Sequence, residues 1–241
     1  PAFFRRQRQM CIRDRSITLG SIAIADGSGG GLASNYNLTT GTFDISQKWV
    51  SVGGQKIYDA TTTVSSSDLD VTGEVTGESI SITGTGSVTD KNVGSGKTID
   101  ISGLSLSDGS HSASNYTIGT TSFAITRRNL SISGEKVYDG TGTVLASQID
   151  TVNTAGGETL TISGEGSVSL PSVGTNKSIT LNTLGISDGT NGTIGLASNY
   201  TLDSGTFDIT TKPITLSGSR QYDGTTDVAS SDLTLIGQVS G

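Results

Sequence analysis

Cysteine and histidine are almost absent from this chain, and their scarcity excludes most catalytic chemistry. Its 241 residues include a single cysteine, Cys11, and a single histidine, His111. Disulfide frameworks, metal thiolates, Cys-His pairs and Ser-His-Asp triads therefore have no basis in the sequence. Paired carboxylates remain available for glycosidase-type catalysis. Aspartate and glutamate, however, recur along the chain in a repeating pattern that does not suit one active site. The sequence predicts no enzyme and no cofactor.

Basic residues are also scarce once the first fifteen positions are set aside. Five of the eight arginines lie in residues 1–15, and residues 16–241 carry a net charge of −11. Met10-Cys11-Ile12-Arg13-Asp14-Arg15 looks like the translation of a transposon adapter used in sequencing libraries. We interpret residues 1–15 as an unstructured artefact of this origin. The alternative is a basic arm that binds nucleic acid or a membrane surface. For the rest of the chain the acidic charge predicts no nucleic-acid partner.

Only ten aromatic residues follow position 15, and nine of them occupy three recurring positions. A Tyr-Asp pair, mostly followed by Gly, recurs with spacings of 80 and 84 residues. Its members are Tyr58, Asp59, Tyr138, Asp139, Gly140, Tyr222, Asp223 and Gly224. An Asn-Tyr pair recurs at the same two spacings, as Asn35, Tyr36, Asn115, Tyr116, Asn199 and Tyr200. A Phe-x-Ile closes each repeat. This periodicity predicts folded modules in which the aromatic residues pack inside.

Between these anchors the hydrophobic pattern has a period of two, which predicts β-strands with one buried face. The segments with this pattern are 17–19, 22–24, 50–52, 80–82, 99–101, 104–106, 130–132, 160–162, 179–181, 184–186 and 214–216. Helical periodicity is limited to one possible turn near residues 65–69. All length variation between repeats falls between Ser-Asp-Gly and Asn-Tyr, which predicts a surface loop there. The expected fold is all-β: tandem, small, sandwich-like modules of about 80 residues with five or six strands each.

Three local motifs have both a chemical and a structural interpretation. The Asp-Gly pairs offer oxygen ligands for calcium, but they lack a known calcium-loop spacing and are more typical of turns. Gly94-Ser95-Gly96-Lys97-Thr98 resembles the end of a phosphate-binding loop, yet a strand pattern follows it where a helix is required. Trp49 lies at a repeat boundary, where we favour a packing wedge over a carbohydrate-stacking platform. The sequence predicts no metal site.

Taken together, these motifs resemble the YDG-type repeat of large bacterial secreted and surface proteins with adhesin-like, haemagglutinin-like domains. The resemblance rests on Lys/Arg-x-Tyr-Asp-Gly-Thr, the run from Asp90 to Lys97, the strand around Leu104 and the Asn-Tyr pair. Ala60 replaces the signature glycine in one repeat, and Leu170-Pro171-Ser172 replaces the Asp-Lys-Asn run in another. The resemblance implies a structural or adhesive array at the bacterial cell surface or in the extracellular space.

The repeat boundaries follow from the spacing of the anchors. Residues 16–48 are expected to be the C-terminal part of one repeat. Residues 49–128 and 129–212 are expected to be complete repeats, and 213–241 the N-terminal part of a truncated one. We therefore expect a fragment of a longer protein.

The expected function is that of a stalk or spacer, with short linkers that favour stiffness. The alternatives are an array of carbohydrate- or surface-binding modules, and part of a β-helical adhesin passenger domain. Partners such as surface glycans or host proteins would bind through domains outside this fragment, and no membrane insertion is expected within it.

Overall fold

A computed structural model describes residues 15–203 and 205–239. The expectation that residues 1–15 are extraneous falls on positions 1–14, outside the described residues, apart from Arg15. The chain divides into two compact units. Unit 1 contains residues to Lys56, Thr62–Asp90 and Gly94–Ala124; unit 2 contains Ile57–Thr61, Lys91–Val93 and the residues from Ile125 onward. Unit 2 thus includes two short segments that the sequence pattern assigns to the preceding repeat.

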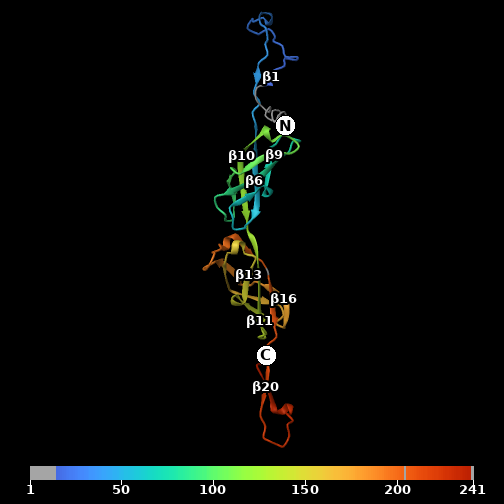
Figure 1. The fold of residues 1–241 in the computed structure, drawn as a ribbon, viewed down its shortest axis with the longest axis vertical. Helices are drawn as coiled ribbons and strands as arrows, with labels where there is room; N and C mark the ends of the chain where they lie inside the picture. Colours follow the sequence, from blue (N-terminus) through green and yellow to red (C-terminus); the bar gives the residue numbers. More distant parts are fainter. Residues whose placement is uncertain (1–14, 204, 240–241) are drawn as a thin grey trace, which may run out of the picture. The chain divides into compact units, whose positions relative to one another are not determined.

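Within unit 1, the strands from β3 to β10 form two four-stranded sheets, and Figure 1 labels three of these strands. The first has the order β5 (Leu69–Thr72), β3 (Lys48–Ile57), β10 (Tyr116–Thr126) and β7 (Gly94–Lys97). In the second, β6 (Ile80–Val88) pairs with β4 (Thr63–Ser65), β8 (Ile99–Asp100) and β9 (Leu104–Asp108). Val50 and Tyr116 of the first sheet pack against Ile80 of the second and against Ala113. The alternating side chains of the two sheets therefore form the core between them, as in a sandwich.

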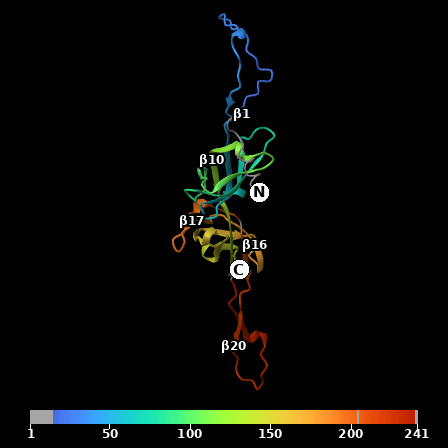
Figure 2. The same cartoon turned by 45° about the horizontal axis from the view of Figure 1, so that its top comes forward.

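Unit 2 repeats most of these pairings in a larger sheet, part of which Figure 2 shows from a second direction. The order is β12 (Thr143–Leu145), β15 (Glu165–Val168), β16 (Gly174–Thr180), β19 (Thr206–Thr210), β11 (Arg128–Val137) and β13 (Ile149–Val152). The short strand β18 (Tyr200–Leu202) also pairs with β11, and β14 (Leu160–Ser163) pairs with β17 (Gly185–Asp188). Phe207, Ile209 and Ile132 lie in the core with at most 1% of their surface exposed.

The first and last strands of the repeat in unit 2 run side by side. β11 pairs in parallel with β19, with Gly134 opposite Phe207. The same glycine faces the carbonyl oxygen of Gln148, which would lie 2.0 Å from any Cβ at position 134. Gly54 and Gly218 have the equivalent contact with Asp68 and Asp232. This glycine therefore recurs in the three repeats that contain the strand, because a side chain on it would collide with the backbone carbonyl of the residue at position 68, 148 or 232.

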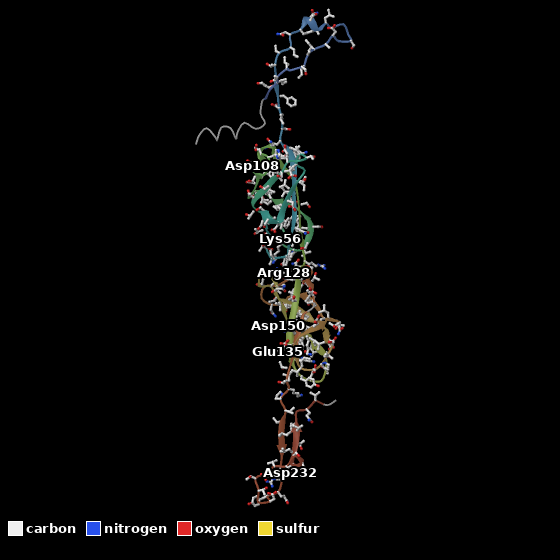
Figure 3. All side chains as sticks on the ribbon, turned by 90° about the vertical axis from the view of Figure 1, so that its right-hand side faces the viewer. Lys56, Asp108, Arg128, Glu135, Asp150 and Asp232 are labelled. Carbon is white, nitrogen blue, oxygen red and sulfur yellow. The ribbon has the colours of Figure 1, made fainter. Side chains whose placement is uncertain are left out.

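An aspartate closes the loop of variable length in each of the three repeats that contain it. The backbone N–H of Ala113 donates to the Asp108 carboxylate at 2.9 Å, and Figure 3 labels Asp108. Ala197 donates to Asp188 at 2.8 Å and Ala33 to Asp26 at 2.7 Å. Because this bond holds the two ends of the loop together, residues can be added between them without displacing the strands.

The expectation of all-β tandem modules is confirmed: the only helical elements among the described residues are 3-10 turns of three residues each. One of these turns, Ser66–Asp68, lies where the sequence predicts a single helical turn. The expected count of five or six strands per repeat is too low, because eight strands (β3–β10) lie in residues 48–126. Several of the additional strands have only two to four residues and leave little periodic signal.

Within the described residues, each of the two partial repeats forms one pair of short antiparallel strands. β1 (Arg15–Ser16) pairs with β2 (Thr42–Phe43), and β20 (Thr215–Gly218) pairs with β21 (Leu233–Ile236). The strands predicted at residues 17–19 and 22–24 are not formed. Their counterparts in unit 1, β8 and β9, both pair with β6, and among the described residues no strand pairs with residues 17–24. Without that partner, a period-two pattern has no sheet to join.

Candidate functional site

The recurring Tyr-Asp signature forms a tight turn whose aspartate binds the backbone two residues further on. The Asp139 carboxylate accepts hydrogen bonds from the Thr141 backbone N–H and hydroxyl, both at 2.9 Å. Asp59 and Asp223 make the same pair of bonds with Thr61 and Thr225. The turn thus has the local geometry that the sequence predicts, and it explains why threonine belongs to the signature.

The residue after the aspartate adopts the left-handed conformation in all three copies. Its φ is 85° at Gly140, 84° at Gly224 and 66° at Ala60. Glycine adopts this conformation without strain, whereas alanine is disfavoured there. The departure at Ala60 therefore preserves the turn at an energetic cost.

A basic residue two positions before the tyrosine completes the turn. The Lys136 side chain is 3% exposed, and its ammonium lies 3.0 Å from the Asp139 carboxylate. It also donates to the carbonyl oxygens of Thr141 at 3.0 Å and Thr143 at 2.7 Å. Arg220 contacts Asp223 and Thr225 in the corresponding way. The Thr141 N–H and the Lys136 ammonium together lower the pKa of Asp139 to about 2.

The three signature tyrosines have very different surroundings. Tyr58 is completely buried, Tyr138 is half-buried and Tyr222 is 92% exposed. The burial expected for Tyr138 is therefore complete only at Tyr58. The difference follows from what lies next to each ring, because the three turns themselves are alike.

Tyr58 is buried in unit 2 by a group that we call the tyrosine–glutamate cluster: Tyr58, Lys91, Glu158 and Tyr200. The hydroxyls of Tyr58 and Tyr200 donate to different oxygens of the Glu158 carboxylate, at 2.7 Å and 2.8 Å. The two rings meet edge to face, with centroids 5.5 Å apart. The Lys91 ammonium lies 2.7 Å from the carboxylate oxygen that Tyr58 also binds. The cluster therefore satisfies a glutamate whose side chain is only 1% exposed.

The electrostatics of the cluster favour a charged Glu158. Burial by itself would raise the pKa of this carboxyl, but hydrogen bonds from Lys91, Tyr58 and Tyr200 outweigh it, so that the pKa is lowered. Burial and the hydrogen bond to Glu158 raise the pKa of both tyrosines. The bond to Glu158 also raises the pKa of Lys91. At neutral pH the cluster is thus one carboxylate, one ammonium and two neutral hydroxyls. No group in it is poised near neutral pH for acid or base catalysis.

Asn199, next to Tyr200, makes a second set of hydrogen bonds in unit 2, to the segment Lys91–Val93. Its side chain accepts from the Val93 backbone N–H at 2.9 Å and donates to the Asn92 side chain at 2.8 Å. Asn199 is 1% exposed. The Asn-Tyr pair of the repeat therefore binds the segment Lys91–Val93, and with Glu158 it binds the signature turn at Tyr58.

Unit 1 contains the same arrangement in part. The Tyr116 hydroxyl donates to Glu78, as Tyr200 does to Glu158. The Val75 N–H donates to the Tyr116 hydroxyl at 3.2 Å, as Ala155 does to Tyr200 at 3.1 Å. Glu78 and Asn115, however, are half-buried where their counterparts in unit 2 are buried. In the first partial repeat, Asn35 and Tyr36 are both exposed.

Sequence reasoning did not assign a role to Glu158. The sequence feature that could have indicated this role is the spacing of 80 between Glu78 and Glu158, which equals the spacing between Tyr58 and Tyr138. Within residues 15–203 and 205–239, no three His, Cys, Asp or Glu side chains are grouped as a metal site requires. His111 is exposed, and its ring bonds the neighbouring Ser110 hydroxyl.

Trp49 does not act as the wedge that we expected. Trp49 is 73% exposed, and a Cβ added at Gly119 in β10 would meet its ring at 3.0 Å. Asn129 and Pro213 occupy the equivalent positions in the following repeats. An aromatic platform at this position is therefore not a feature of the repeat.

These features define a class of protein: an all-β tandem repeat whose recurring residues build turns and a buried polar cluster. The model of the YDG domain matches residues 47–123 and 126–207, and the chain belongs to this family. No curated protein and no solved structure matches the chain. Among the described residues, no helix has the length and apolar character needed to cross a membrane.

Proposed function

We propose that this chain is a structural repeat array, a stalk or spacer in an extracellular or cell-surface protein of a bacterium. One observation carries the proposal: Tyr58 and Lys91, which the sequence assigns to the repeat 49–128, complete the buried cluster of unit 2. The signature of one repeat thus packs with the Asn-Tyr pair and glutamate of the next. The extracellular bacterial setting rests on the sequence resemblance to secreted and surface proteins.

Burial and charge make this an effective attachment. Tyr58 contributes a fully buried aromatic ring, and Glu158 provides a buried carboxylate whose hydrogen bonds come from Tyr58, Lys91 and Tyr200. Removing Tyr58 and Lys91 would leave the buried Glu158 carboxylate with the Tyr200 hydroxyl but without its cation and its second hydroxyl donor, which is unfavourable. The cluster therefore holds the segments 57–61 and 91–93 within unit 2, and such an attachment is the property that a spacer requires.

The proposal is tested by the distance between a spin label in each unit. The only native cysteine, Cys11, is replaced by serine. The exposed residues Ser81 and Thr175 are each changed to cysteine, and a spin label is attached to each. If the chain is a spacer, double electron–electron resonance should give one narrow distribution of distances between the two labels. Tyr58→Ala should broaden it, whereas Tyr222→Ala, at a tyrosine that is 92% exposed, should leave it unchanged. A broad distribution in the otherwise unmodified chain would contradict the proposal.

A further inference from the structure

The end of unit 1 that carries Glu78, Asn115 and Tyr116 has the side chains of an attachment site. We call these three residues the acceptor of unit 1. Their counterparts in unit 2, Glu158, Asn199 and Tyr200, bind the segments 57–61 and 91–93. The Tyr116–Glu78 bond and the Val75–Tyr116 bond reproduce those of unit 2. The acceptor is thus already arranged as it is in the occupied site.

What differs is its exposure. Glu78 and Asn115 are half-buried, whereas Glu158 and Asn199 are 3% and 1% exposed. Residues 15–48, which precede this repeat, contain neither a Tyr-Asp pair nor an Asp-Lys-Asn run. Within the described part of unit 1, no tyrosine hydroxyl and no ammonium therefore takes the places that Tyr58 and Lys91 take at Glu158.

We infer that the acceptor of unit 1 is a docking site for the signature turn and Asp-Lys-Asn run of another YDG repeat. The occupant brings a tyrosine hydroxyl and a lysine ammonium to the Glu78 carboxylate, and a backbone N–H and a side-chain amide to Asn115. Complementarity of charge favours this occupant, because a half-buried carboxylate gains most from a cation and a neutral donor. The inference rests on the proposed array, of which it names the joining surface.

The acceptor of unit 1 also discriminates between repeats that could dock on it. The repeat 49–128 carries Lys91 and Asn92 in its run, whereas the repeat 129–212 has Pro171 and Ser172 at these positions. Pro171 offers no cation in place of Lys91, and Ser172 lacks the side-chain amide of Asn92. A donor of the Asp-Lys-Asn type is therefore the one that fits Glu78.

The test adds a donor to the full chain by inserting a second copy of residues 49–128 between residues 48 and 49. Glu78→Gln in the original repeat is then compared in the native and in the extended chain. The substitution should lower the unfolding midpoint of unit 1 by roughly 4–8 °C more in the extended chain, as expected for the loss of one charge-assisted contact in a domain of this size. Glu158→Gln, whose donor is present in both chains, serves as the matched control and should have equal effects.

Two further measurements make the result decisive. Tyr58→Ala together with Lys91→Ala in the inserted copy should remove the difference between the chains. Amide exchange at Val75, which donates to Tyr116, should slow in the extended chain. Equal effects of Glu78→Gln in both chains, with unchanged exchange at Val75, would overturn the inference. The proposed function fails separately, through a broad spin-label distribution in the chain without an insertion.

Discussion

The three signature tyrosines provide a graded series in which one substitution has three expected outcomes. Tyr58 is completely buried, Tyr138 is half-buried and Tyr222 is 92% exposed. Replacing a fully buried aromatic side chain by alanine costs about 3–5 kcal/mol. We expect Tyr58→Ala to destabilise unit 2 by this amount, Tyr138→Ala by clearly less, and Tyr222→Ala by no more than about 0.5 kcal/mol.

The hydroxyl contribution of Tyr58 can be separated from that of its ring. Tyr58→Phe keeps the edge-to-face contact with Tyr200 but removes the bond to Glu158. A hydrogen bond to a charged group contributes about 1.5–3 kcal/mol. We expect a value near the lower end, because Lys91 still binds the same carboxylate oxygen.

Calorimetry and urea unfolding measure these effects for each unit. Fluorescence of Trp49, the only tryptophan, reports on unit 1, whereas four of the six tyrosines lie in unit 2 and two in unit 1, so tyrosine signals report mainly on unit 2. Tyr58→Ala should therefore shift mainly the unfolding transition of unit 2, which the tryptophan fluorescence does not follow. Three equal destabilisations would show that the tyrosine acts within its own turn, and our explanation of its burial would then be wrong.

Two further predictions concern the signature turn. Ala60→Gly should stabilise the chain by up to about 1 kcal/mol, because Ala60 has a φ of 66° and glycine adopts this conformation without strain. The reverse change, Gly224→Ala, should lower the stability of its own hairpin. Thermal unfolding of the two variants measures both effects. For Asp139, the folded-state pKa of about 2 lies below its ordinary value near 3.9, so its stabilisation is present above pH 4 and is lost as the pH falls toward 2. Asp139→Asn should therefore weaken the loss of stability between pH 4 and 2 in acid titrations, and an unchanged acid profile would contradict the assigned bonds.

The turn could be predicted from sequence because its chemistry is local. Asp139 binds Thr141, only two residues away, and Gly140 takes a backbone conformation typical of its residue type. The repeated strands were predictable for a similar reason, since alternation of side chains along a strand is visible within a few residues.

The tyrosine–glutamate cluster could not be derived in the same way. Tyr58 and Glu158 are 100 residues apart, and a local pattern carries no information on which distant carboxylate meets a given hydroxyl. Sequence reasoning assigned the tyrosine to the end of its own strand, where burial is incomplete in the two later copies. The predicted strands at residues 17–19 and 22–24 failed for a related reason, because a strand requires a partner that its own sequence does not specify.

In the proposed array, the difference between Lys91 and Pro171 would change the strength of the attachment between repeats. The Glu158 carboxylate is almost fully buried and has three donors: two tyrosine hydroxyls and the Lys91 ammonium. A joint made by the donor segment around Pro171 would retain the hydroxyls but lose the cation. The buried charge would then lack its strongest partner, and burial would raise the carboxyl pKa with less opposition. The runs that begin at Asp90 and at Leu170 come just after equivalent strands, β6 and β15. In the proposed array, such a substitution therefore changes the attachment between repeats without changing how either repeat folds.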